Sequence, residues 1–189
     1  QTCVAPDYLY IHKSVKDEFL KLLKESVEEL YSMDAISSGN FTKIVSERHF
    51  NRLTGFLDNG DTFFGGRTNK EKLSIEPTVL TNINWDNEVM EDEIFGPILP
   101  VLEYDDLSDM ITRVNDRPKP LALYIFSESE QVQKMILEHI SFGGGCINDT
   151  VYHLSSPYLP FGGVGESGIG AYHGQGSFDV FSHEKSILK

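Results

Sequence analysis

The chain has 189 residues, of which 40% are hydrophobic, and this length and composition predict one folded domain with a sizeable core. Its 29 acidic and 16 basic residues give a formal net charge of −13, which excludes nucleic acid and anionic lipid surfaces as favoured partners. No apolar run reaches the roughly 18 residues of a membrane-spanning helix, so no membrane segment is predicted. Two cysteines are too few for a disulfide framework, which favours a reducing, cytoplasmic location.

Strand-like and helix-like patterns alternate from the start of the chain. Residues 8–12 predict a strand, and Ser14 is expected to cap the helix that follows. The apolar face of that helix is formed by Phe19, Leu20, Leu23, Val27 and Leu30. A second helix is predicted from the apolar spacing of residues 50–57, and the turn chemistry of residues 58–60 ends it.

The alternation continues in the second half. Residues 98–104 predict a strand, residues 107–114 a helix and residues 121–126 a buried strand. Residues 127–130 have the sequence Ser-Glu-Ser-Glu, which predicts a capping box between the first hydroxyl and the last carboxylate. We expect this box to begin a helix that runs through Ile140.

A long loop follows the last of these helices. Residues 143–148 predict a short strand with close backbone approach, and a stretch rich in Ser, Pro and Gly then runs to about Gly176. Loops of this length in compact domains tend to be functional. The repeated β-α units predict an α/β fold, with a mostly parallel twisted sheet covered by helices.

Residues 163–168 match the pattern G-x-G-x-x-G of dinucleotide-binding sites. That site also needs a preceding strand, a following helix and an acidic residue about 20 positions later. Residues 154–160 do not read as a strand, and Asp179 comes too early. We therefore predict a glycine-permitted loop whose tight turns place Phe161 at the mouth of a pocket.

Outside residues 163–168, the sequence gives only weak signs of a ligand site. Glu93 and Phe95 are two residues apart, so an extended segment would place a carboxylate and a ring on one side, as a nucleoside would require. An ordinary acidic turn is the alternative. No metal site is predicted, because the six histidines show neither an i, i+4 pair nor a cysteine partner. An isolated cysteine such as Cys3 or Cys146 is, taken alone, most often a small buried apolar residue.

Three segments together resemble the aldehyde dehydrogenase superfamily. They are residues 1–6, with Cys3 in a Gln-x-Cys context, residues 93–97, with the sequence Glu-Ile-Phe-Gly-Pro, and residues 160–168. The resemblance runs from Gln1 to the end of the chain. It is closer to the class 3-like branch than to other branches.

That branch is indicated by further segments, residues 146–150, 153–165 and 170–174, which have close counterparts there. Gly165 stands where other branches often have lysine, which favours the same assignment. Cys146 matches a packing position in this branch, beside Asn148.

The resemblance implies oxidation of an aldehyde to a carboxylic acid with NAD or NADP as the cofactor. Cys3 would attack the aldehyde carbonyl, its N–H would form half of the oxyanion hole, and water would cleave the resulting thioester. Glu93 would bind the hydroxyls of the nicotinamide ribose, and Phe95 would pack on the nicotinamide end. Phe161 would line the aldehyde pocket, with Asn148 as a nearby polar support.

The resemblance also implies a domain organisation. Residues 1–176 would be a catalytic domain truncated at its N-terminal side, and residues 177–189 an oligomerisation segment with a strand at residues 181–188. The nucleotide-binding domain, the general-base glutamate and the oxyanion-hole asparagine belong upstream of the cysteine in this family. We therefore expect a homodimeric, cytoplasmic parent enzyme, and an isolated chain that is inactive and does not bind the cofactor.

Two other function classes stay open. A non-catalytic assembly module is one, because an orphaned C-terminal strand has unpaired edge groups that attract a partner chain. A cysteine hydrolase is the other, but it needs a general-base histidine beside Cys3, and no histidine spacing nominates one. Aldehyde-dependent NADH formation by the full-length protein separates an enzyme from a module, and ester hydrolysis without NAD would indicate the hydrolase.

Overall fold

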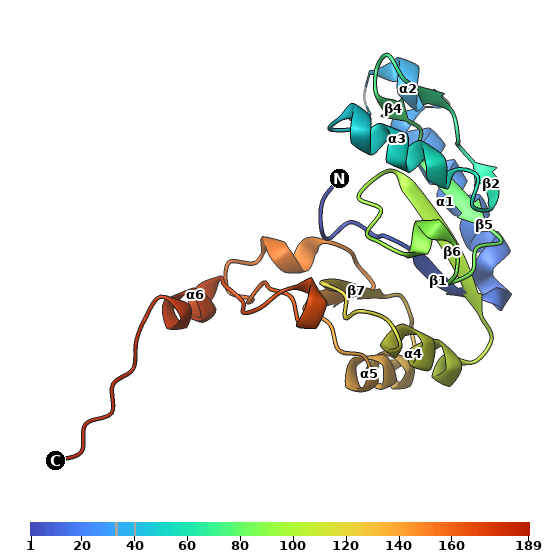
Figure 1. Ribbon diagram of the computed structural model, residues 1–189. Helices are drawn as coiled ribbons and strands as arrows, with labels where there is room; N and C mark the ends of the chain where they lie inside the picture. Colours follow the sequence, from blue (N-terminus) through green and yellow to red (C-terminus); the bar gives the residue numbers. More distant parts are fainter. Residues whose placement is uncertain (33, 40) are drawn as a thin grey trace. The chain divides into compact units, whose positions relative to one another are not determined.

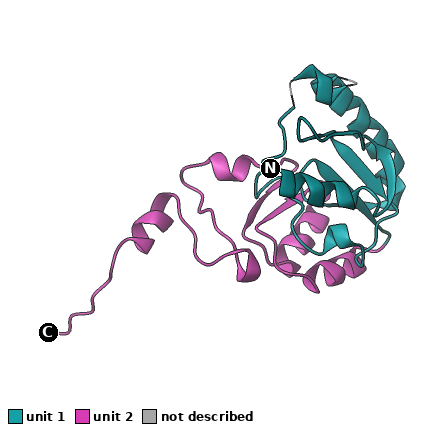
Figure 2. Cartoon of the chain, turned by 45° about the horizontal axis from the view of Figure 1, so that its top comes forward, with its two compact units in different colours: residues 1–105 teal, residues 106–189 magenta. Residues whose placement is uncertain are grey.

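The computed structural model describes residues 1–32, 34–39 and 41–189, which form two compact units, residues 1–105 and 106–189 (Figure 2). Each unit contains helices together with strands (Figure 1). The α/β class predicted from the sequence is therefore confirmed. The division after Asp105 was not predicted, and the functional assignment of residues 1–176 and 177–189 stays a prediction.

The sheet of the first unit has four strands. In spatial order they are β1 (Leu9–His12), β6 (Ile98–Tyr104), β5 (Thr78–Thr81) and β2 (Asp61–Phe64). The pairs β1–β6 and β6–β5 are parallel, whereas β2 runs antiparallel to β5 at the edge. A separate antiparallel pair is formed by β3 (Thr68–Asn69) and β4 (Ser74–Ile75). The sheet is thus mostly parallel, as predicted.

The helices α1 (Lys13–Tyr31), α2 (Ala35–Ser38) and α3 (Glu47–Phe56) belong to this unit. The predicted cap of α1 is wrong, since His12 and not Ser14 caps it, its Nδ1 accepting from the Ser14 N–H at 3.2 Å. The chain passes directly from β1 into α1, so the last strand residue has the extended backbone that a cap requires.

No helix in the described part of the chain has the length and apolar character needed to span a bilayer.

Both faces of the sheet are buried. Side chains alternate along β6, so that Ile98 and Leu102 pack in one core cluster and Val101 packs in the other. The first cluster contains the α3 residues Phe50, Leu53 and Phe56, all at most 3% exposed, as their spacing predicted. The second contains Leu20 of α1, which is 1% exposed. Phe19 and Leu30, also predicted on that face, are 40% and 72% exposed, so the core contact of α1 centres on Leu20 and Leu23.

Aromatic rings form a ladder over one face of the same sheet. Trp85 meets Tyr8 and Tyr10 edge to face, with ring centroids 5.3 and 5.6 Å apart. Tyr10 meets Tyr104 at 5.5 Å, and Tyr104 meets His12 at 5.3 Å. Edge-to-face contacts at these distances stabilise aromatic pairs beyond their burial. The ladder ties β1 to β6 and to the turn that carries Trp85.

The second unit contains a parallel pair of strands, β7 (Ala122–Ile125) and β8 (Gly144–Ile147). Its helices are α4 (Leu107–Asn115), α5 (Glu130–His139) and α6 (Gly174–Val180), with 3₁₀ turns at Tyr152–Ser155 and Gly165–Ser167. The prediction that β7 is buried holds only for Ile125, since its other residues are half-exposed. A strand with a single paired neighbour keeps more of its surface in solvent.

The start of α5 also differs from its prediction. Ser129 is the cap, and its hydroxyl accepts from the Val132 N–H at 3.4 Å. The predicted box between Ser127 and Glu130 is wrong, because Ser127 belongs to the preceding loop. Its main-chain N–H and C=O are both bonded to the side chain of Asn148.

The C-terminal strand predicted at residues 181–188 is absent from the structure. Phe181 ends α6, and residues 181–189 are exposed with no strand among them (Figure 1). A β-strand needs a hydrogen-bonded neighbour, and the described chain offers none at this position. Pairing of this segment with another subunit stays a prediction.

Replacing Leu53 by alanine tests the central place of α3 in the core. Leu53 is 0% exposed, so we expect Leu53→Ala to lower the free energy of unfolding by about 2–5 kcal/mol, from lost burial and the cavity left behind. Leu22→Ala in α1 is the matched control, because Leu22 is 53% exposed. Urea titration measures both, and equal midpoints for the two variants would contradict this account.

Candidate active site

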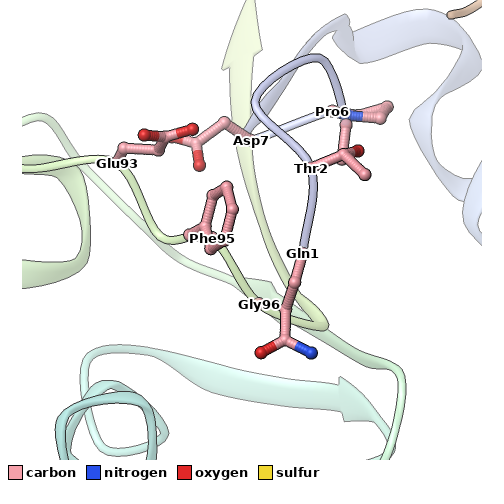
Figure 3. A pocket seen from close by; sticks show the side chains of 8 residues that line it. Gln1, Thr2, Pro6, Asp7, Glu93, Phe95 and Gly96 are labelled. Atoms are coloured by element: carbon pink, nitrogen blue, oxygen red, sulfur yellow. The ribbon is translucent and has the colours of Figure 1, made fainter. Parts of the chain in front are cut away.

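Two segments far apart in sequence meet in the first unit. Residues 1–7 lie against residues 93–96 (Figure 3). The two segments line a pocket through Gln1, Thr2, Ala5, Pro6, Asp7, Glu93, Phe95 and Gly96. Its volume is about 10 Å³, which admits about one water, so a larger ligand would have to lie across its mouth. The structure thus brings the predicted residues Glu93 and Phe95 to the segment that carries Cys3.

Cys3 lies in a turn rather than at a helix end. The Ala5 N–H donates to the Thr2 carbonyl at 3.1 Å, which closes the turn. The side chain of Val4 points inward and is 3% exposed, whereas Cys3 is exposed. The thiol is therefore presented to solvent by a turn whose next residue is fixed in the core.

Cys146 has a different environment. It lies in β8, half-buried, with its Sγ 3.7 Å from Nδ1 of His153. Removal from water lowers the pKa of His153, which favours the neutral imidazole beside the thiol. This matches the packing role predicted for Cys146.

Helix α3 holds the loop of residues 93–95 through its main-chain carbonyls. Arg52 donates from Nη2 to the Glu93 carbonyl at 2.6 Å and from Nη1 to the Ile94 carbonyl at 3.1 Å. His49 donates from Nε2 to the Phe95 carbonyl at 2.9 Å. Three successive carbonyls are therefore fixed by two side chains of one helix.

The sequence of α3 explains why it can do this. Ser46 caps the helix by accepting from the His49 N–H at 3.2 Å. His49 and Arg52 are three residues apart, so they share a helix face. The Arg52 guanidinium also lies 5.0 Å from the centre of the Phe56 ring, which limits its orientation.

The loop itself has an uncommon backbone. Phe95 has φ of +53°, a left-handed conformation that is unfavourable for a bulky residue. Gly96 has no room for a side chain, because a Cβ there would lie 2.6 Å from Cδ1 of Leu53. Ile94, between Glu93 and Phe95, is 1% exposed. The loop is therefore held by core packing on one residue and hydrogen bonds on its neighbours.

Two carboxylates face one another beside this loop (Figure 3). Asp7 accepts from the Ile94 N–H at 2.9 Å through Oδ1. Burial raises the pKa of Asp7, although the main-chain N–H groups of Ile94 and Phe95 and the charge of Arg52 oppose the shift. Partial removal from water raises the pKa of Glu93, the negative charge of Asp7 adds to this, and Arg52 opposes it. Both acids therefore bind a proton at higher pH than isolated carboxyl groups do.

Phe161 lies in a groove of the second unit, of about 410 Å³. The groove is lined by Leu121, Phe161, Gly162, Gly163, Ser167, Gly168, Ile169, Gly170, Ala171, Tyr172 and Val180. Main-chain hydrogen bonds of 2.8 and 3.0 Å pair Phe161 with Tyr172 across it. Phe161 therefore lines this groove, while its place in an aldehyde pocket stays a prediction.

The residues that match G-x-G-x-x-G form a tight loop with a short 3₁₀ turn. A Cβ on Gly163 would lie 2.2 Å from the Ser167 carbonyl oxygen, so the loop closes only with glycine there. Neither a preceding strand nor a long following helix flanks it among the described residues. The glycines serve close backbone packing, as predicted.

Both polar atoms of the Asn148 side chain are hydrogen-bonded to main-chain groups. Its Oδ1 accepts from the Ser127 N–H at 2.9 Å and its Nδ2 donates to the Ser127 carbonyl at 3.2 Å. It does not belong to the groove lining given above. It links the end of β8 to the loop before α5, and a supporting role near a substrate stays a prediction.

Across residues 1–32, 34–39 and 41–189, no cluster of three or more His, Cys, Asp or Glu side chains could hold a metal ion.

The sequence analysis missed three residues of this site: Asp7, His49 and Arg52. For His49 and Arg52 a signal existed, because their spacing places both on one face of a helix. Their acceptors are carbonyl groups, however, and carbonyl groups carry no side-chain signature. For Asp7, the sequence shows only a carboxylate between Pro6 and a predicted strand, which does not indicate a contact with residues 93–95.

Removing the Arg52 side chain tests the hold of α3 on the loop. Arg52→Ala leaves the carbonyls of Glu93 and Ile94 without their donor, so we expect the free energy of unfolding to fall by about 1–3 kcal/mol. Arg48→Ala is the control, since Arg48 is an exposed residue of the same helix and should change it by less than about 0.5 kcal/mol. Urea titration gives the values, and hydrogen exchange should be faster at the Ile94 amide in Arg52→Ala only.

Comparison with known proteins assigns this arrangement to a family. The model of the "Aldehyde dehydrogenase family" matches residues 1–187. The 4,4'-diaponeurosporen-aldehyde dehydrogenase of Staphylococcus aureus is 47% identical over 190 residues, covering 100% of this chain and 41% of that protein. A rat protein named "Aldehyde dehydrogenase, dimeric NADP-preferring" is 43% identical over 188 residues, covering 100% of this chain and 42% of that protein. Relatives with family 3 in their names are 41–46% identical.

A solved structure is similar over the same extent. The substrate-bound state of Staphylococcus aureus AldH has a TM-score of 0.93 and 44% identity, covering 100% of this chain and 43% of that one. The chain therefore spans about two-fifths of the length of these relatives.

Proposed function

The chain belongs to the aldehyde dehydrogenase family, and on this basis we propose that the full-length protein oxidises aldehydes to carboxylic acids with NAD or NADP. One observation carries the proposal. An exposed cysteine lies in a segment packed against the loop of Glu93 and Phe95, in a chain that matches the family along almost its whole length. The class 3-like branch, indicated by the sequence, agrees with the family 3 relatives.

Cys3 is the nucleophile in this proposal. Its thiolate forms a bond to the carbonyl carbon, and the oxygen becomes an alkoxide that accepts a hydrogen bond from the Cys3 N–H. A bound NAD or NADP would accept the hydride that this carbon loses as the carbonyl re-forms as a thioester. Water adds to the thioester, the acid departs, and the thiol is restored. The base that activates this water is expected upstream of Cys3.

Glu93 and Phe95 fit the ribose and nicotinamide ends of such a cofactor. The Glu93 carboxylate is exposed at the pocket, and the Phe95 ring lies beside it (Figure 3). A carboxylate is a strong acceptor for ribose hydroxyls, and a ring offers a flat apolar surface. When bound, the cofactor supplies the hydride acceptor. The role of these two residues is to orient it over Cys3.

The partners and location follow from the same family. We infer a homodimer, in line with the rat relative named as dimeric, and either NAD or NADP as cofactor. The exposed apolar residues of the C-terminal segment, among them Phe181 and Leu188 at 88% and 100% exposure, support a role in assembly. A cytoplasmic location suits a chain whose two cysteines are both free.

A cysteine hydrolase has less support. Such an enzyme needs a histidine that takes the proton of the nucleophile. In this site, His49 donates to the Phe95 carbonyl and so serves the loop.

Replacing the Cys3 sulfur by oxygen tests whether Cys3 is the nucleophile. Cys3→Ser in the full-length protein should abolish aldehyde-dependent formation of reduced cofactor, because a serine hydroxyl has no accessible anion near neutral pH. Cys146→Ser is the control and should keep turnover largely intact. Absorbance of NADH or NADPH measures both, and wild-type turnover in Cys3→Ser would end the proposal.

Neutralising Glu93 tests the cofactor role. Glu93→Gln keeps the shape but replaces a charged acceptor with a weaker neutral one, so cofactor should bind more weakly and hydride transfer should slow. Glu91→Gln, at an exposed position of the same acidic segment, should change neither. Titration and single-turnover kinetics give the two quantities. The ribose role would be abandoned if both stayed at wild-type values in Glu93→Gln.

A further inference from the structure

The side chain of Gln1 is bonded at both ends to the main chain of a distant segment. Its Nε2 donates to the Lys43 carbonyl at 2.9 Å, and its Oε1 accepts from the Val45 N–H at 3.0 Å. Two bonds of opposite direction fix both the position and the orientation of the amide plane.

The segment that receives Gln1 is itself anchored. Ile44, between the two bonded residues, is 1% exposed and belongs to the core cluster that contains α3. Its N–H donates to the Leu73 carbonyl at 2.7 Å. Gln1 is therefore attached to a part of the chain that cannot shift without disturbing the core.

Asp7 forms the anchor on the other side of Cys3. Its carboxylate accepts from the Ile94 N–H at 2.9 Å, and Ile94 is buried in the same core cluster. Between the two anchors, Val4 is buried and the Thr2–Ala5 turn is closed by its hydrogen bond. Gln1, Val4 and Asp7 are thus fixed in place, and all three lie within four residues of the exposed thiol of Cys3.

We propose that Gln1 and Asp7 are positioning residues for Cys3, which hold its turn at a set distance from the Glu93–Phe95 loop. The inference rests on the proposed function, because it concerns the reaction in which Cys3 would act. Gln1 sets the position of the turn from the side of residues 43–45. Asp7 joins the turn to the loop that would orient the cofactor, so one carboxylate links the two halves of the site.

Positioning matters because hydride transfer needs a defined geometry. A misplacement of about 1 Å can cost about 100-fold in rate when the reacting atoms lie in a near-attack arrangement. Alkylation of an exposed thiol by a small reagent has no such requirement. The two reactions of Cys3 therefore respond differently to a loosened turn.

The variants separate hydrogen bonding from side-chain length. Gln1→Met keeps the length and removes both bonds, whereas Gln1→Glu keeps an acceptor for the Val45 N–H and loses the donor to the Lys43 carbonyl. Asp7→Ala removes the acceptor for the Ile94 N–H, and Asp7→Asn keeps one. Gln131→Met, at an exposed position of α5, is the matched control.

In the full-length protein, we expect Gln1→Met and Asp7→Ala to lower kcat by about 10- to 100-fold, while the melting temperature falls by only a few degrees from the loss of main-chain hydrogen bonds. Asp7→Asn should recover most of the rate, and Gln131→Met should match the wild type. Iodoacetamide should alkylate Cys3 at a rate within about twofold of wild type in every variant, with Cys146 as the internal reference in peptide mass spectrometry.

The outcomes distinguish the two proposals. Full turnover in Cys3→Ser removes the proposed function. An inactive Cys3→Ser together with wild-type kcat in Gln1→Met and Asp7→Ala overturns the positioning role alone. If Gln1→Met does not fold, Gln1→Glu decides: a reduced kcat at unchanged alkylation supports the role of Gln1, and wild-type kcat overturns it.

Discussion

The site depends on the hydrogen bonds that α3 makes to successive carbonyls of residues 93–95. The same helix places Leu53 in the core and places His49 and Arg52 on the loop. Because a helix is stiff over ten residues, movement of its apolar face would move its polar face as well. Core packing and loop geometry are therefore set together, and neither can change alone.

This coupling explains how an unfavourable backbone persists at Phe95. A left-handed conformation costs on the order of 1–3 kcal/mol for such a residue. The hydrogen bond from His49, the burial of Ile94 and the close contact of Gly96 with Leu53 all oppose relaxation. The loop is thus arranged before any ligand arrives, which lowers the ordering cost of binding.

The elements with strong periodicity were predictable from the sequence. The strand at Ile98–Tyr104 and the helix around Leu53 follow directly from apolar spacing, and both were found. Helix caps were less predictable, because several hydroxyl groups compete near a helix start: the Ser127 hydroxyl accepts from the Ser129 N–H, and Ser129 itself caps α5. The C-terminal strand was predicted from a family resemblance, and the described part of the chain offers that segment no hydrogen-bonded neighbour. The spacing of His49 and Arg52 shows that they share a helix face, but the partners of Arg52 and Gln1 could not be predicted, since main-chain groups leave no pattern in the sequence.

The aromatic ladder gives this chain a built-in optical reporter. Trp85 is its single tryptophan, and the rings of Tyr8 and Tyr10 contact it directly after the anchor at Asp7. Tyrosine excitation passes to an indole at such short range, so the emission of Trp85 depends on the seating of the strand that follows the Cys3 turn. Fluorescence therefore follows the docking of this segment without any attached label.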